Sequence, residues 1–173
     1  EILERDIKKL EAIKAPFYRK TYAEVLKILK EKEKIDLPFG KDLRTIEEDL
    51  IMKHFDKPLM VTNYPKEIMA FYKKRDPKMK DTALCFDMLA PEGYGEIIGG
   101  SERDTDIEEL KKALKKEGEK AENYDWYLDL RRYGSVQHAG FGLGVERVVS
   151  WICGLDNIKD AIPFPRTMLR WKP

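Results

Sequence analysis

Apolar positions in the first third of the chain recur at the three- and four-residue spacing of amphipathic helices. Residues 2–13 show this spacing in a charged background and end before Pro16. Two more helices are predicted to begin at capping boxes, in which Thr is followed three residues later by Glu: Thr21 with Glu24, and Thr45 with Glu48. The pattern therefore predicts a helical first third.

Short apolar runs typical of strands follow in the middle of the chain. Residues 58–62 form one run, and residues 83–89 and 95–102 form two more. The turn at residues 90–94 connects the last two, which predicts an antiparallel pair.

The last third returns to helical patterns around one more strand. Residues 104–120 carry acids in the first turn and lysines in the last, which complements the helix dipole. Residues 124–134 predict a shorter aromatic helix, and residues 139–145 a glycine-rich strand that leads into another helix. Helices followed by antiparallel strands predict an α+β fold with an antiparallel sheet flanked by helices.

Composition narrows the class of protein. The 173 residues include 33 Lys and Arg against 32 Asp and Glu, and this balance argues against a dedicated nucleic-acid clamp. No apolar run approaches the roughly 20 residues of a membrane span. Cys85 and Cys153 lie in apolar segments without a CxxC spacing, so we expect buried thiols in a reducing compartment. A cytoplasmic location is therefore predicted.

Alternating glycines are the first candidate for chemistry. One face of the predicted strand carries no side chains at Gly140, Gly142 and Gly144, because alternate residues of a strand point to the same face. A flat ligand can then lie on the backbone, and Arg147 follows at a position from which it can pair with phosphate or stack on an aromatic ring. Close strand–helix packing beside a surface arginine fits the same pattern.

Two carboxylates flank the predicted turn of the hairpin. Asp87 and Glu96 lie on its two strands, and their oxygens suit a hard cation such as Mg²⁺. Asp87 also interrupts an apolar strand, where an unpartnered carboxylate is costly. The alternative is a pair of solvent-facing acids near a turn.

Further polar candidates follow on the same strand and before the glycines. Gly99 and Gly100 allow close approach of a ligand, and Ser101 and Arg103 come directly after them. Arg103 is a candidate for reading a small polar substrate, although a strand ending in a charged loop explains it equally well. His138 is a candidate substrate-loop residue or a structural histidine. No Ser-His-Asp arrangement or thiolate cluster is visible, which disfavours hydrolytic and zinc chemistry.

Three segments resemble class II aminoacyl-tRNA synthetases of the aspartate/asparagine/lysine group: residues 61–72, 86–103 and 124–147. Residues 140–166 are similar to motif 3 and the C-terminal tail of these enzymes. Within the group the segments are most similar to asparaginyl enzymes, since an aspartyl enzyme would show a GxEIxSGAQR-like stretch where this chain has GEIIGGSER. The resemblance implies the class II catalytic fold.

The resemblance also implies a role for each candidate residue. Gly140, Gly142 and Gly144 would form the floor under the adenine of ATP, and Arg147 would stack on adenine and contact the γ-phosphate. Asp87 and Glu96 would hold Mg²⁺ on the ATP phosphates, and Arg147 and Glu96 would be the catalytic residues. Substrate binding would involve Ser101, Arg103 and His138, with Arg103 reading the amino-acid side chain.

The implied reaction joins asparagine to ATP and then to tRNA(Asn), in a homodimeric enzyme with no membrane contact. Two other enzymes fit the same segments: an aspartyl-tRNA synthetase, and a synthetase-related asparagine synthetase. Residues 1–173 would be the C-terminal portion of the catalytic domain, because motif 1, motif 2 and an anticodon-binding domain have no counterpart in this sequence. A non-catalytic partner fragment is therefore a further alternative.

Overall fold

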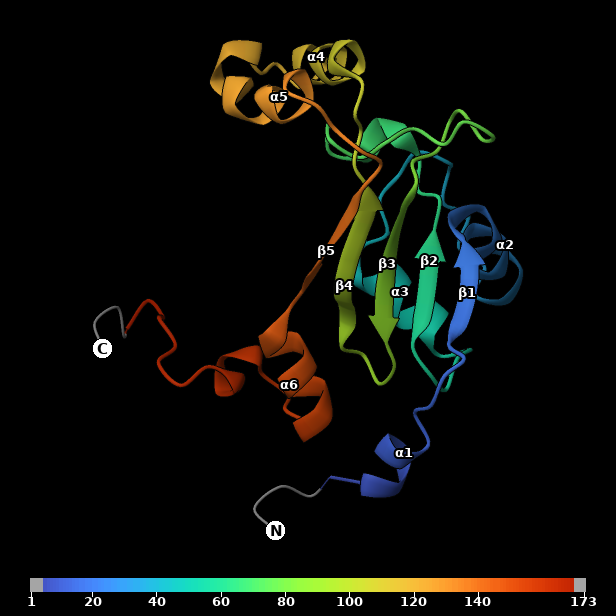
Figure 1. Cartoon of the computed structure of the whole chain (residues 1–173). Coiled ribbons are helices and arrows are strands. Elements are labelled where there is room, and N and C mark those ends of the chain that lie inside the picture. The colour runs from blue at the N-terminus through green and yellow to red at the C-terminus, as the bar shows by residue number, and fades with distance from the viewer. Residues whose placement is uncertain (1–4, 170–173) are drawn as a thin grey trace.

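The computed structural model describes residues 5–169 and contains one five-stranded sheet (Figure 1). The strands follow the sheet in chain order, as β1 (Tyr18–Thr21), β2 (Leu59–Thr62), β3 (Cys85–Ala90), β4 (Gly95–Glu102) and β5 (Ala139–Leu143). β1 is parallel to β2, and every other neighbouring pair is antiparallel. The predicted antiparallel hairpin and glycine-rich strand are confirmed as β3–β4 and β5.

The start of the chain is less helical than its pattern predicts. The first helix, α1, covers only Ile7–Glu11, and residues 1–4 of the predicted helix lie outside the described residues. β1 had no counterpart in the prediction, because its side chains are exposed or half-buried and show no apolar alternation. Only its pairing with β2 makes this segment a strand.

The first predicted capping box is confirmed at the start of α2 (Tyr22–Lys32). The Glu24 amide donates to Thr21 Oγ1 at 3.2 Å, and the Thr21 amide donates to Glu24 Oε2 at 2.8 Å. These two bonds satisfy amides that lack partners within the helix.

The second predicted capping box is wrong by one residue. In α3 (Thr45–Met52) the residue before the helix is Arg44, whose amide donates to Glu47 Oε2 at 3.0 Å. Arg44 Nη2 also lies 2.6 Å from Glu47 Oε1. Because Glu47 fills the capping role, Glu48 is free to point toward the sheet.

The two faces of the sheet pack against different helices. α2 and α3 cover one face, where the core includes Tyr22, Val25, Leu29, Ile51, Leu59, Val61 and Leu89. On the other face, Trp151 of α6 (Val145–Cys153) packs with Met88, Ala90 and Ile97. Cys85 is buried as expected, whereas Cys153 is only half-buried, and both thiols are free.

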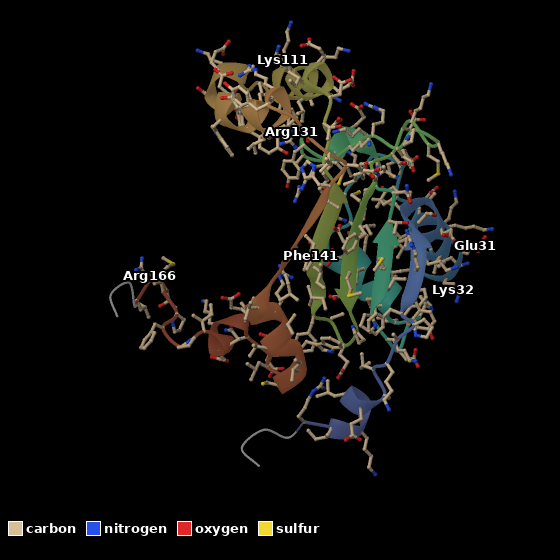
Figure 2. The ribbon with its side chains drawn as sticks, viewed as in Figure 1. Glu31, Lys32, Lys111, Arg131, Phe141 and Arg166 are labelled. Atoms are coloured by element: carbon tan, nitrogen blue, oxygen red, sulfur yellow. The ribbon has the colours of Figure 1, made fainter. Side chains whose placement is uncertain are left out.

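The remaining helices lie beyond one end of the sheet. α4 (Ile107–Lys116) and α5 (Asp125–Arg132) confirm the predicted helices, and they pack together there with the turn η2 (Ala121–Tyr124). Figure 2 shows Lys111 and Arg131 in this helical unit, Phe141 along β5, and Arg166 in the distant C-terminal segment. That segment is irregular apart from the turn η3 (Ile158–Ala161), and the turn η1 (Lys66–Ile68) follows β2. Within the described residues, no helix is long and apolar enough to cross a membrane.

Candidate active site

A β-bulge brings Asp87 and Glu96 to the same face of the sheet. Asp87 pairs with Gly99, but the register shifts between Met88 and Leu89, so that Leu89 pairs with Glu96. In unbroken alternation Glu96 would face the opposite side from Gly99. The bulge instead lets Ile97 and Ile98 both pack on the second core and returns Glu96 to the face of Asp87.

The two carboxylates converge over a glycine. A β-carbon on Gly99 would lie 2.5 Å from Glu96 Oε1 and 3.3 Å from Asp87 Oδ1. Any other residue at position 99 would therefore displace at least one carboxylate oxygen. The Tyr64 hydroxyl donates a hydrogen bond to Asp87 from the buried side of the site.

Glu48 adds a third carboxylate that the sequence analysis missed. It accepts a backbone hydrogen bond from Glu96, and its Oε2 lies 2.9 Å from the position of a β-carbon on Gly95. The sequence offered two adjacent glutamates in helical register with Arg44 and Thr45, and only the local backbone decides which of them caps the helix. The other one, Glu48, faces the site.

Burial and neighbouring negative charge change the proton affinity of Glu48 and Asp87. Burial, together with the charges of Glu96 and Asp87, raises the pKa of Glu48 to about 7. Burial and the Glu96 charge raise the pKa of Asp87 to about 6, while Lys73 acts in the opposite direction. Burial is the largest cause of both shifts, and repulsion from Glu96 adds to it.

A cavity of about 580 Å³ is lined by these acids and by two cationic side chains. Glu48, Asp87 and Glu96 line one part of it, and Ser101, Arg103 and Lys73 line another. Arg103 stacks over the ring of Tyr72, with the guanidinium carbon 4.5 Å from the ring centroid. The cavity is thus lined by side chains of both signs of charge.

The three predicted floor glycines have different surroundings. Gly142 pairs with Gly99 and borders the cavity, and a β-carbon there would meet no atom within 4 Å. A β-carbon on Gly140 would lie 2.9 Å from Arg103 Nη2, and one on Gly144 would lie 3.4 Å from Arg147 Cδ. Gly142 therefore leaves open space and Gly140 makes room for Arg103, while a β-carbon on Gly144 would be in ordinary contact with Arg147.

Arg147 and His138 do not line this cavity. Arg147 is exposed in the first turn of α6 and borders a neighbouring hollow of about 500 Å³, but its Nη1 lies 3.6 Å from the position of a Gly95 β-carbon, beside Glu48. His138 is exposed, and its Nδ1 lies 2.8 Å from the Val136 carbonyl oxygen. The His138 carbonyl accepts from the Arg103 amide at 2.9 Å. His138 therefore holds the backbone of Arg103 in place through its own backbone.

Asp87 and Glu96 suit a metal ion that is also coordinated by groups outside the protein. Across residues 5–169, no group of three or more His, Cys, Asp or Glu side chains is arranged to hold a metal ion. Asp87 and Glu96 supply only carboxylate oxygens, which fit a hard cation already coordinated by phosphate. The donor chemistry therefore fits phosphate-bound Mg²⁺ and not a closed protein cage.

Comparison with known proteins decides the family. Residues 1–168 match the family model described as "tRNA synthetases class II (D, K and N)". The chain belongs to this family. An asparagine–tRNA ligase from Sorangium cellulosum (strain So ce56) is 49% identical over 99% of this chain and 41% of its own length, so the chain spans about two fifths of that relative.

Solved structures of the family share the fold. The asparaginyl-tRNA synthetase from Pyrococcus horikoshii, complexed with asparaginyl-adenylate, is 48% identical, with a TM-score of 0.94 over 99% of this chain and 39% of its own. An aspartyl-tRNA synthetase from Entamoeba histolytica is 28% identical, with a TM-score of 0.85 over 93% of this chain and 34% of its own. The implied class II fold and the resemblance to asparaginyl enzymes are confirmed.

Proposed function

We propose that this synthetase chain takes part in activating asparagine with ATP and attaching it to tRNA(Asn). The observation that carries the proposal is the 49% identity to an asparagine–tRNA ligase along 99% of the chain. The cavity supports it, because its acids suit a metal–phosphate group and its cations suit a polar amino acid.

The first step needs no nucleophile from the protein. An oxygen of the asparagine α-carboxylate attacks the α-phosphorus of ATP, a new P–O bond forms, and the bond to the bridging oxygen breaks to release pyrophosphate. The protein acts by positioning both substrates and by stabilising charge on the phosphates. Arg147 supplies positive charge for the phosphates and a planar group for adenine, and Gly142 leaves the β5 backbone open to the nucleotide.

Asp87 and Glu96 would hold Mg²⁺ together with the ATP phosphates. Bound Mg²⁺ would neutralise charge on the phosphates as pyrophosphate leaves. The convergence of Asp87 and Glu96 over Gly99 supports this assignment, because a cation between them would relieve the repulsion of their charges. We expect Mg²⁺ to bind tightly only in the presence of ATP, which calorimetric titration with and without ATP measures; tight binding without nucleotide would contradict the assignment.

The partners follow from the same proposal. They are ATP, asparagine and tRNA(Asn), in a homodimer located in the cytoplasm. We also propose that residues 1–173 are the C-terminal portion of a catalytic domain whose motifs 1 and 2 lie on other residues.

The test is ATP–pyrophosphate exchange with asparagine, aspartate and lysine. It is run with this chain by itself and with the upstream part of the Sorangium cellulosum relative added as a separate chain. We expect asparagine-dependent exchange in the combination and none with the chain by itself. Absence of asparagine-dependent exchange from the combination, with both parts folded, would overturn the proposed function.

A further inference from the structure

A second cavity, of about 320 Å³, is lined by residues of the turn η1, of the segment that follows it and of α4. Met69, Phe71 and Ala113 form its apolar lining, and charged side chains of both signs form most of the rest. Among the described residues, only Met69 lines both this cavity and the one that contains Asp87 and Glu96. The second cavity is therefore a separate place on the molecule.

Lys66 is the buried cation of this second cavity. The residue is 9% exposed, and its ammonium group donates a long hydrogen bond of 3.5 Å to the Ala70 carbonyl oxygen. Within the part of the chain that the structure describes, no carboxylate forms an ion pair with it. A lysine ammonium has three hydrogens to donate, and burying it without a counter-ion is costly. A bound anion would remove that cost.

Arg75 adds a second positive charge to the same cavity. Its segment and that of Lys66 both pair with the residues just before β3: the Lys66 amide donates to the Asp81 carbonyl oxygen at 2.8 Å, and Arg75 forms an antiparallel bridge with Ala83. Burial lowers the pKa of Lys66, and the charge of Arg75 lowers it further. The two cations are therefore close enough to repel each other.

The acids that line the cavity compensate this charge only in part. Glu67 forms ion pairs with Arg75, at 3.7 Å, and with Lys116 of α4. Glu109 is paired with a lysine of its own helix at 2.8 Å. Three cations of the cavity, Lys66, Arg75 and Lys116, thus have one ion-paired carboxylate among them, and it belongs to a side chain that is 57% exposed.

Two further acids act on Lys66 from a greater distance. Asp104 and Glu117 raise the pKa of Lys66, but each of them acts less strongly than Arg75 does in the opposite direction. Asp104 Oδ1 also accepts a hydrogen bond from the Asp106 amide at 3.0 Å. Room for an additional negative group therefore remains beside Lys66 and Arg75.

We propose that Lys66 and Arg75 form a binding site for the phosphate group of a small molecule. This site is independent of the proposed function, because it lies in a different cavity. An ammonium group binds phosphate as a point charge, and a guanidinium group offers paired donors that match two phosphate oxygens.

Charge and size favour a phosphate monoester over other anions. A phosphate monoester carries about two negative charges at pH 7 and so matches two cations, whereas a carboxylate carries one. The apolar residues Met69, Phe71 and Ala113 suit the carbon part of such a molecule. A cavity of about 320 Å³ has room for a ligand of this size.

Calorimetric titration of the chain with inorganic phosphate tests the proposal, and we expect a dissociation constant of about 1 mM or below. Because the proposed ATP site also attracts phosphate, the variants and not the total heat identify the site. Lys66→Met keeps the length of the side chain and removes its charge, and it should weaken phosphate binding by about tenfold or more. Lys111→Met removes a charge of α4 outside the cavity, where Lys111 pairs with Glu108 at 3.1 Å, and should leave the affinity unchanged. Arg75→Gln, at a more exposed side chain, should weaken binding in the same direction and serves if Lys66→Met unfolds.

A single-stranded RNA without terminal phosphates distinguishes a small molecule from a nucleic-acid backbone. We expect wild type and Lys66→Met to bind this RNA equally, because Lys66 is nearly buried and a phosphodiester backbone stays at the surface. Loss of RNA binding in Lys66→Met with unchanged phosphate binding would overturn the assignment to a small molecule. Wild-type phosphate binding weaker than about 10 mM would overturn the site itself. So would an unchanged affinity in folded variants of both Lys66 and Arg75, or an equal loss in Lys111→Met.

Discussion

Glu48 lies against Gly95, at the start of β4, and is held there by the backbone of the next residue. Its Oε2 is 2.9 Å from the position that a β-carbon on Gly95 would occupy, and the Glu96 amide donates to its carboxylate. The contact joins α3 to the hairpin and places a third acid beside Asp87 and Glu96. Crowding of these charges has consequences for stability that can be measured.

Glu48→Gln should make the protein more stable at neutral pH and flatten its pH dependence. The pKa of Glu48 is raised from 4.5 to about 7, so the folded state retains a proton that the unfolded state releases. Its contribution to stability is therefore present below pH 4.5 and is lost as pH rises toward about 7. Because the group is partly exposed and solvent screens its charge, we expect a gain of only about 1 kcal/mol at pH 8.

Urea unfolding at a series of pH values measures this effect. Asp49→Asn, on the same helix but outside the lining of the cavity, is the control. Equal gains at pH 4 and pH 8 would show that the change acts through packing and not through the charge of Glu48.

Gly142→Ala should weaken ATP binding without weakening the fold. The added methyl group meets no protein atom within 4 Å, and alanine lowers the conformational entropy of the unfolded chain. If the nucleotide lies on this part of β5, the methyl group occupies its space and affinity falls by about tenfold. Thermal unfolding and ATP titration check the two halves of the prediction, and unchanged ATP affinity would remove the nucleotide from this strand.

Arg147→Ala should reduce ATP–pyrophosphate exchange by about a hundredfold or more, or roughly 3 kcal/mol. Arg147 is the only arginine in the described part of α6, and its guanidinium lies beside Gly95 and Glu48. The assay uses the chain together with the upstream part of a relative. Arg132→Ala is the control, because Arg132 is paired with Asp125 and Asp129 on the surface of α5. Near-normal exchange by the Arg147 variant would refute its assignment.

Thr21→Ala should destabilise the chain by about 1 kcal/mol, because it removes the acceptor for the Glu24 amide. Thr45→Ala should cost less than about 0.5 kcal/mol, since Glu47 and Arg44 cap α3 without it. Urea unfolding of both variants compares them directly. Equal losses would mean that Thr45 stabilises its helix by a contact other than the cap.

Local patterns in the sequence were sufficient to predict many of the helices and strands of the fold. The Thr21 capping box, the hairpin of β3 and β4, the two helices after it and the glycine-rich strand each depend on residues close together in the chain. β1 could not be found this way, because its four residues become a strand only by pairing with β2, about 40 residues later.

The sequence by itself determined the family and the identity of most groups in the site, including Asp87, Glu96 and Arg103. Only the tertiary structure decided where they point. Glu96 reaches the face of Asp87 through a bulge that forms because Ile97 and Ile98 both pack on the second core, and Glu48 enters the site because Glu47 caps α3. Lys73 lies beside Arg103 because its segment pairs with the residues at the start of β3 and the end of β4. Each of these placements depends on contacts between distant segments, which a periodic pattern along one segment does not contain.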